Sequence, residues 1–193
     1  MNNYCKILKK EDFITSNWSG GTTTQLFIYP EKSTLRALDF QFRLSTATVE
    51  QEESQFSKLE KIQRFITPLD GNLILTHDNQ NFITLNPFET YEFDGNWFTK
   101  SYGLVKDLNL MISQGIKGSL SSHFLKANYP LVINTERGFN FVYTPFKELG
   151  IMVGSQELLL SPKQLLLLHN HFSSPIKIVC ETEAALLFAT IFL

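Results

Sequence analysis

Polar side chains that could bind a small molecule gather in two early stretches of the sequence. The stretch from Trp18 to Gln25 reads Trp-Ser-Gly-Gly-Thr-Thr-Thr-Gln, and its two glycines allow a sharp turn or a close backbone approach. If the segment is a strand, Thr22 and Thr24 project to the same face. The pattern fits the edge of a ligand site, and it equally fits a turn that enters a β-branched strand. A phosphate-binding loop is not indicated, because no Gly-Lys-Ser/Thr follows.

Arg43 and Ser45 form the second stretch. They lie between Asp39 and Val49, where polar and hydrophobic residues alternate, which predicts a strand with Arg43 and Ser45 on one face. Inside a barrel, Arg43 would need an anion, and its planar guanidinium group suits a carboxylate. On a solvent-facing side it would be an ordinary surface charge, and the sequence leaves both interpretations open.

The histidines give little support for a metal centre. His169 and His171 are two residues apart, so in a strand their side chains share a face, from which two histidines could bind one metal ion. Neither a nearby following Glu nor a later His completes the set of three or four ligands that such a site needs. We therefore expect no metal and no cofactor.

Nucleophilic catalysis is not indicated either, because the sequence has no Gly-x-Ser-x-Gly motif.

Composition limits the class of protein. The chain has 193 residues, a formal net charge of -2 and scattered Lys and Arg, so neither nucleic acid nor a membrane surface is an expected partner. Cys5 and Cys180 are expected to be free thiols. The sequence shows no apolar signal-peptide stretch and no run of about 18 apolar residues, so we expect a cytoplasmic protein.

Short apolar runs between Gly, Pro, Asn and Asp predict an all-β fold, and the 17 Phe residues fit half-buried sheets. The runs Leu73–Thr76 and Phe82–Leu85 predict a hairpin. Lys9–Phe13 could form one helical turn, and Lys106–Ser113 is too short to assign. Further strands are predicted at Thr90–Phe93, Phe139–Tyr143, Gly150–Val153, Glu157–Leu160, Leu165–Leu168, Ile176–Val179 and Ala185–Leu193.

The order strand, Leu-x-Pro turn, strand occurs twice, at Pro87 and at Pro162, each time after a predicted hairpin. Such an echo indicates two copies of one supersecondary unit. The Gly- and Ser-rich stretch Gln114–Ser122 is the expected connection. We therefore predict an N-terminal barrel over residues 1–115 and a C-terminal barrel over residues 116–193, between which strands could be exchanged.

At this point the sequence resembles the HutD/Ves family, a cupin-fold group linked to histidine utilisation or environmental stress. The resemblance is clear over residues 4–115. The matching segments, in order, are Trp18–Leu26, Phe42–Ala47, Phe56-Ser57 before Arg64, Phe93–Gly95 and Lys106–Met111.

The resemblance implies a cupin (RmlC-like) double-stranded β-helix in a two-barrel, or bicupin, arrangement without the metal-binding histidines. It also implies binding or sensing of a small carboxylate metabolite such as formylglutamate. The chain has Gln25 where a typical member has an acidic residue, and Gln63-Arg64 where Asp-Arg is common, which changes the ligand groups that can be paired. The predicted ligand-binding residues are Trp18, Thr22, Thr24, Gln25, Arg43, Ser45 and Arg64.

Three hypotheses follow for the function. The preferred one is a metal-free, non-enzymatic binding or regulatory protein for a small carboxylate. The alternative is a metal-dependent cupin enzyme, a dioxygenase or isomerase, that uses His169 and His171, and bound stoichiometric metal would favour it. The third is an interaction protein that forms a homodimer through an exposed sheet edge, which requires no enclosed polar pocket.

Overall fold

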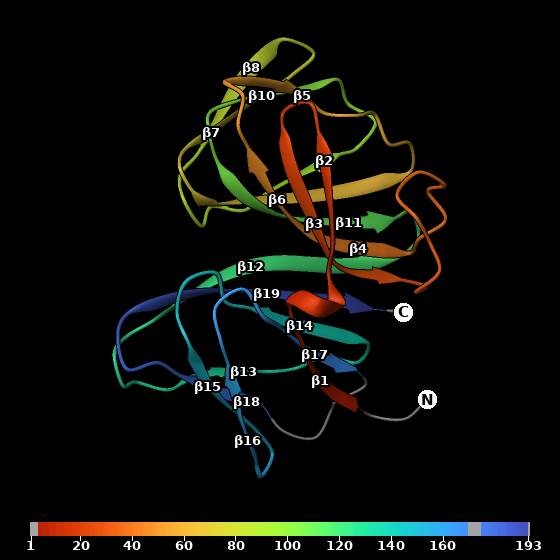
Figure 1. Ribbon diagram of the computed structural model, residues 1–193. Coiled ribbons are helices and arrows are strands. Elements are labelled where there is room, and N and C mark those ends of the chain that lie inside the picture. Colours follow the sequence, from red (N-terminus) through yellow and green to blue (C-terminus); the bar gives the residue numbers. More distant parts are fainter. Residues whose placement is uncertain (1–3, 170–174, 193) are drawn as a thin grey trace. The chain divides into compact units, whose positions relative to one another are not determined.

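The computed structural model describes residues 4–169 and 175–192, and its regular structure is almost entirely β (Figure 1). Among the described residues, the one helical element is a short 3-10 turn at Lys10–Asp12, within the predicted helical stretch. The predicted all-β class is confirmed. None of the helical structure in the described ranges has the length and apolar character needed to cross a membrane.

The chain forms two compact units. We call residues 13–116 the N-terminal unit, and residues 1–12 together with 117–193 the C-terminal unit. The division at 115/116 predicted from the sequence places residues 1–12 in the first half, whereas strand pairing places them in the second, because β1 (Tyr4–Leu8) pairs with β17 (Leu165–His169). An isolated run of five residues carries no signal for a partner this far along the chain.

The N-terminal unit contains a six-stranded sheet in the order β2-β3-β4-β11-β6-β9 and a four-stranded sheet in the order β5-β10-β7-β8. Hydrophobic side chains of both sheets meet in one cluster, which includes Ile66, Leu75 and Phe93. The bounds are β2 Ile14–Trp18, β3 Gly21–Tyr29, β4 Phe42–Val49, β5 Glu53–Gln55, β6 Ile62–Asp70, β7 Leu73–His77, β8 Gln80–Leu85, β9 Tyr91–Asp94, β10 Thr99–Tyr102 and β11 Lys106–Ser113.

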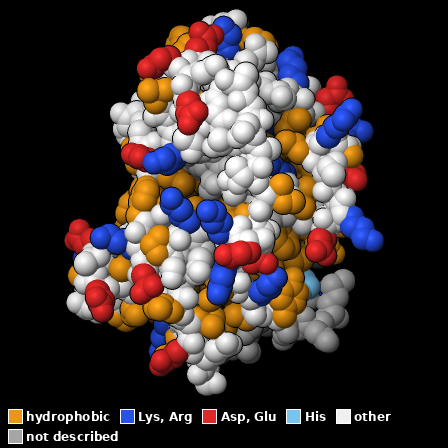
Figure 2. Space-filling view, in the orientation of Figure 1, with side chains coloured by type: hydrophobic (Ala, Val, Ile, Leu, Met, Phe, Trp, Pro, Cys, Tyr) orange, Lys and Arg blue, Asp and Glu red, His pale blue; other side chains and the backbone are white. Residues whose placement is uncertain are grey.

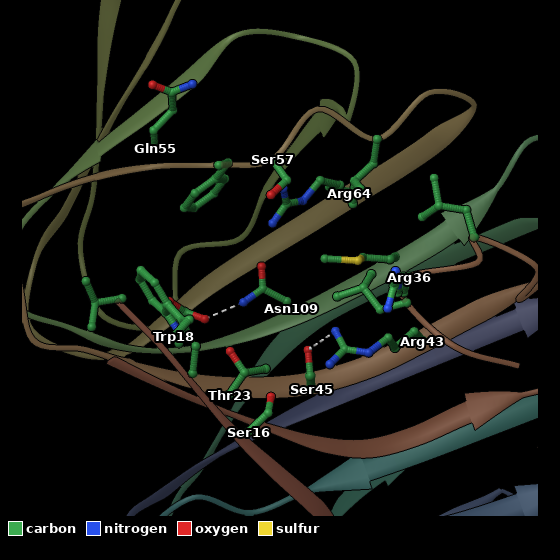
Figure 3. Close-up of a pocket in the computed structure, with 18 residues that line it drawn as sticks. Ser16, Trp18, Thr23, Arg36, Arg43, Ser45, Gln55, Ser57, Arg64 and Asn109 are labelled. Carbon is green, nitrogen blue, oxygen red and sulfur yellow. Dashed lines mark hydrogen bonds between the residues drawn. The ribbon is translucent and has the colours of Figure 1, made fainter. Parts of the chain in front are cut away.

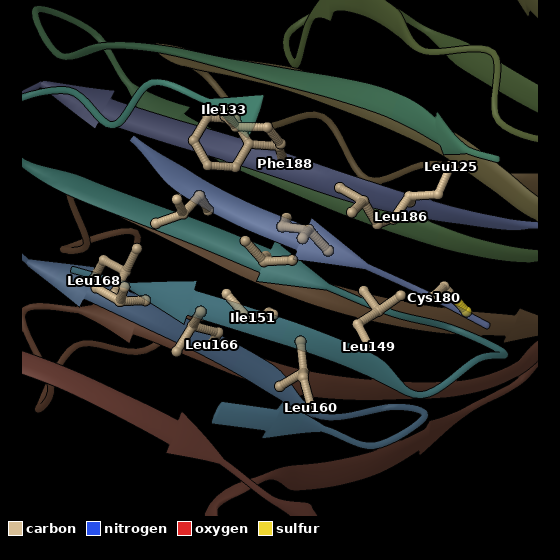
Figure 4. Close-up of a cluster of buried hydrophobic side chains, with 14 residues drawn as sticks. Leu125, Ile133, Leu149, Ile151, Leu160, Leu166, Leu168, Cys180, Leu186 and Phe188 are labelled. Atoms are coloured by element: carbon tan, nitrogen blue, oxygen red, sulfur yellow. The ribbon is translucent and has the colours of Figure 1, made fainter. Parts of the chain in front are cut away.

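The C-terminal unit contains a five-stranded sheet in the order β1-β17-β14-β19-β12 and a four-stranded sheet in the order β13-β18-β15-β16. Leucine, isoleucine and valine side chains of both sheets fill the space between them (Figure 4). Apart from β1 and β17, the bounds are β12 Lys117–Leu125, β13 Leu131–Ile133, β14 Phe139–Tyr143, β15 Leu149–Val153, β16 Gln156–Leu160, β18 Ile176–Val179 and β19 Ala184–Phe192.

The same strand order occurs in both units. The series β9-β6-β11-β4 in one corresponds to β17-β14-β19-β12 in the other, and β5-β10-β7-β8 corresponds to β13-β18-β15-β16. Pro87 lies between β8 and β9, and Pro162 lies between the corresponding strands β16 and β17. The short echo in the sequence therefore marks equivalent places in two units of similar topology.

The segment that the sequence pattern left unassigned, Lys106–Ser113, is a central strand. β11 pairs with β4 along one edge and with β6 along the other. Six of its eight residues are buried, so it lacks the alternation by which half-exposed strands are recognised. This strand matters for function because it joins the two strands that carry Arg43 and Arg64.

Charged side chains do not form a single-sign patch on the face drawn in Figure 2, where Lys and Arg lie among Asp and Glu. This mixture agrees with the formal net charge of -2. Nothing on that face resembles the continuous basic surface that binds a phosphate backbone.

The Gly20-Gly21 turn yields a test of the fold. Gly21 has a φ of +147°, and a Cβ atom there would lie 1.9 Å from the Thr48 carbonyl oxygen. We expect Gly21→Ala to lower the free energy of unfolding by roughly 3 kcal/mol, because backbone strain and a backbone clash add together. Urea denaturation measures the change.

Gly115→Ala is the matched control. Gly115 also has a positive φ, of +90°, but no atom lies within 4 Å of the added Cβ. We expect a loss of about 1 kcal/mol, from strain alone. Equal losses in the two variants would show that the contact at Thr48 does not constrain the turn.

Candidate functional site

The N-terminal unit encloses a cavity of about 530 Å³ (Figure 3). This volume is in the range of pockets that hold small metabolites. Every lining residue belongs to residues 13–116. The polar and charged members of the lining are Ser16, Thr23, Arg36, Arg43, Ser45, Gln55, Ser57, Arg64, Asp107 and Asn109, with the Trp18 indole beside them.

Strand register brings the charged residues together. Directly paired residues of antiparallel strands project to the same face, and Met111 on β11 lies opposite both Arg43 on β4 and Arg64 on β6. Asn109, two residues before Met111 on β11, lies opposite Ser45 on β4. The period of two then places one row of side chains from three strands into one cavity.

On β3, the register places a different threonine in the cavity from the two that the sequence suggested. Thr23 lines the cavity, opposite Ala47 of β4, while Thr22 and Thr24 do not. The hydroxyl of Thr24 lies 2.9 Å from the Thr15 hydroxyl of β2. Thr22 and Thr24 do share a face, but the alternation could not show which face is the inner one.

Trp18 lines the cavity from the end of β2, next to the glycine pair. A Cβ atom on Gly20 would lie 2.1 Å from the Trp18 ring. The absence of a side chain at Gly20 therefore leaves the space that the indole occupies.

Arg43 is 5% exposed and is held by neutral partners. Its Nε donates to Gln25 Oε1 at 2.9 Å, and its Nη1 donates to Ser45 Oγ at 3.0 Å, as Figure 3 shows for Ser45. Gln25 thus orients Arg43 without lining the cavity itself. Burial lowers the pKa of Arg43, because the charge has lost water and gained no anion.

Arg64 is 7% exposed and lies against two neighbouring aromatic rings. Its guanidinium carbon is 4.5 Å from the Phe56 ring centroid and 5.2 Å from that of Phe93. Its Nε is buried and donates no hydrogen bond. Burial lowers the pKa of Arg64 to about 10; Asp107 opposes this shift and Arg43 adds to it. With this pKa the group is charged at neutral pH, and the cation–π contacts with the two rings do not neutralise it.

Asp107 is the acidic member of the lining. It is 2% exposed and accepts a hydrogen bond from Asn109 Nδ2. Burial raises the pKa of Asp107 to about 7, although Arg64 and the Asn109 hydrogen bond act in the opposite direction. The Oδ1 atom of Asn109 is buried without a hydrogen-bond partner, so it is a free acceptor beside the carboxyl group.

Positive charge exceeds negative charge in the lining of the cavity. Within the described ranges, the ion pairs involve Lys6, Lys100 and Lys106, and neither Arg43 nor Arg64 forms one. Two buried cations thus face one carboxyl group that is only partly ionised at neutral pH. A guanidinium group with free N–H donors can bind a carboxylate through two parallel hydrogen bonds.

Sequence reasoning named Trp18, Arg43, Ser45 and Arg64, which the structure gathers around the cavity, and missed Asp107 and Asn109. Both missed residues lie in the Lys106–Met111 segment that carries part of the family resemblance. Without a strand assignment for that segment, no face could be assigned to its side chains.

His169 is not among the residues that line the cavity. His169 belongs to β17 of the C-terminal unit, where its ring centroid is 4.2 Å from that of Phe139 and 5.2 Å from that of Tyr4. His171 lies outside the described residues. Over residues 4–169 and 175–192, no three His, Cys, Asp or Glu side chains converge as a metal site. Cys5 and Cys180 are free thiols.

Solved structures of similar fold include two from Pseudomonas and one cupin. The conserved protein PA5104 from Pseudomonas aeruginosa PAO1 is 18% identical, with a TM-score of 0.85 over 98% of this chain and 100% of that one. HutD from Pseudomonas fluorescens SBW25 is 19% identical, with a TM-score of 0.74 over 98% and 100%. A cupin 2 conserved barrel domain protein from Leptotrichia buccalis is 12% identical, with a TM-score of 0.61 over 97% and 96%.

These structures establish a cupin-like fold. No curated protein matches the sequence. The family model described as HutD matches residues 10–188, which is nearly the whole chain and includes every residue that lines the cavity. The chain therefore belongs to the HutD family.

Proposed function

We propose that the protein binds a small carboxylate metabolite, such as formylglutamate, in the cavity of the N-terminal unit. The observation that carries the proposal is the pair of buried arginines, Arg43 and Arg64, neither of which forms an ion pair among the described residues. A buried charge without a counter-ion costs free energy, and a ligand carboxylate supplies the counter-ion.

The surroundings of the two arginines fit a ligand with both polar and apolar parts. Phe56 and Trp18 offer apolar walls, while Ser45 and Asn109 offer hydrogen-bonding groups. A carboxylate, which can accept two parallel hydrogen bonds from a guanidinium group, is the ligand group that we place against the arginines.

The proposed role is regulatory or sensing, without catalysis and without a metal, in the cytoplasm. Among the described residues, the cavity lining contains no His or Cys that could pair with a serine as base or act as a nucleophile. The shared strand order of the two units supports a bicupin arrangement. In that arrangement the N-terminal unit binds the ligand and the C-terminal unit has a hydrophobic interior.

Formylglutamate binding to the purified protein tests the proposal directly. We expect saturable binding by isothermal titration calorimetry, and stabilisation by about 2.7 kcal/mol at a ligand concentration 100 times the dissociation constant. A melting screen over related small carboxylates covers the case in which another member of the class is the natural ligand. No stabilisation by any carboxylate would contradict the proposal.

Arg43→Ala should weaken carboxylate binding by well over tenfold, since loss of a buried charge pair costs about 2–5 kcal/mol. Lys100→Ala is the control. It removes the same charge from the same unit, but Lys100 pairs on the surface with Glu53 at 2.7 Å. Calorimetry should give this variant the wild-type affinity. Equal affinities for wild type and Arg43→Ala would make Arg43 a structural charge only.

The double variant His169→Ala, His171→Ala tests the metal-dependent alternative. We expect unchanged metal content and unchanged carboxylate affinity, because His169 packs on Phe139 and Tyr4 in the unit that does not hold the cavity. Elemental analysis of both purified proteins measures the metal. A stoichiometric metal that disappears in the variant would establish the alternative.

A further inference from the structure

Asp107 is the one acidic side chain of the cavity lining within the described residues. It projects from β11, the strand between the two that carry the buried arginines. The charged groups that share the cavity lining with it are Arg64 from β6, Arg43 from β4 and the exposed Arg36 from the segment between β3 and β4, and the charge of Arg64 acts on it directly. β5 and the residues after it contribute the neutral side chains of Gln55, Phe56, Ser57 and Leu59.

The protonation state of Asp107 therefore decides how much anionic charge the cavity can accept. When Asp107 is protonated, the charges of Arg43 and Arg64 are both uncompensated. When it is ionised, it partly neutralises Arg64 and repels any other carboxylate in the same small volume. Among the described contacts, Asp107 accepts a hydrogen bond from the Asn109 amide and forms no ion pair with either arginine.

A bound carboxylate would in turn change Asp107. By pairing with the arginines, the ligand would reduce the attraction that Arg64 exerts on the Asp107 carboxylate, and it would bring a like charge close to it. Both effects favour the protonated form. Thermodynamic linkage then requires a reciprocal effect: protonation of Asp107 raises the affinity for the ligand by the same factor by which bound ligand raises the affinity of Asp107 for a proton.

We propose that Asp107 couples ligand binding to protonation: the cavity takes up a carboxylate together with one proton from solvent, and Asp107 carries that proton. The protonated carboxyl group then offers an O–H donor to the bound anion, in addition to the guanidinium donors. Asp107 thereby sets both the charge that the site accepts and the pH at which it fills. This inference rests on the proposed carboxylate site and adds its regulation by pH.

The test is a calorimetric titration of formylglutamate between pH 6 and pH 8.5. Both carboxyl groups of this probe have ordinary pKa values near 4, so the probe stays ionised throughout. Burial raises the pKa of Asp107 to about 7, and we therefore expect the wild-type affinity to fall more than tenfold from pH 6 to pH 8.5. Titrations at pH 7.5 in buffers of different ionisation enthalpy should show uptake of roughly one-half to one proton per ligand.

Asp107→Asn is the matched variant, because it keeps the shape and an acceptor for the Asn109 amide but cannot titrate. We expect its affinity to change less than about twofold over the same pH range, with no proton uptake. If this variant does not fold, the proton count of the wild type alone decides between coupling and its absence.

The outcomes separate the two proposals. Wild-type binding that is lost in Arg43→Ala, but shows neither pH dependence nor proton uptake, would overturn the coupling and leave the carboxylate site standing. Proton uptake that persists in Asp107→Asn would also overturn the role of Asp107. Absence of binding to the wild type at every pH would overturn the carboxylate site and the coupling with it.

Discussion

The site depends on one constraint: two guanidinium charges are buried in the interior of a two-sheet unit that supplies too little negative charge for them. Arg43 is held by the neutral groups of Gln25 and Ser45, and Arg64 lies against the neighbouring rings of Phe56 and Phe93. Hydrogen bonds and ring faces fix the positions of the charges without cancelling them. The excess of positive charge in the cavity is thus part of the folded structure, and it is the physical basis of the proposed carboxylate site.

The two units place different side chains on similar strands. In the C-terminal unit, the inner faces of β14, β17 and β19 carry Val142, Leu166, Leu168, Leu186 and Phe188, which pack into a continuous hydrophobic cluster. In the N-terminal unit, the inner faces of β4, β6 and β11 carry the arginines, Ser45, Asp107 and Asn109 around open space. One topology therefore supports a filled interior in one unit and a binding cavity in the other.

The sequence pattern predicted those features of the fold that depend on neighbouring residues, namely single strands and turns. Alternation from Asp39 to Val49 correctly predicted the strand and the shared face of Arg43 and Ser45, while the Pro87 and Pro162 turns marked equivalent places in the two units. The sequence pattern did not predict which strands pair when they are far apart in the chain. The partner of β1 lies in β17, and the inner face of β3 is set by its register with β4, so neither the place of residues 1–12 nor the orientation of Thr23 could be derived from neighbouring residues.

Gln25 and Gln63, which the family resemblance in the sequence singled out, stand in different relations to the cavity. Gln63 lies opposite Asp94 and alternates with Arg64 on β6, so it projects away from the cavity and does not change its lining. Gln25 contacts Arg43 directly. An acidic side chain there would neutralise Arg43 and weaken its attraction for a ligand anion, whereas the amide of Gln25 orients the guanidinium group and leaves its charge in place. Asp107 is then the one carboxyl group of the described lining that could repel a bound anion. Its protonation is therefore the one change that would reduce the negative charge of the lining.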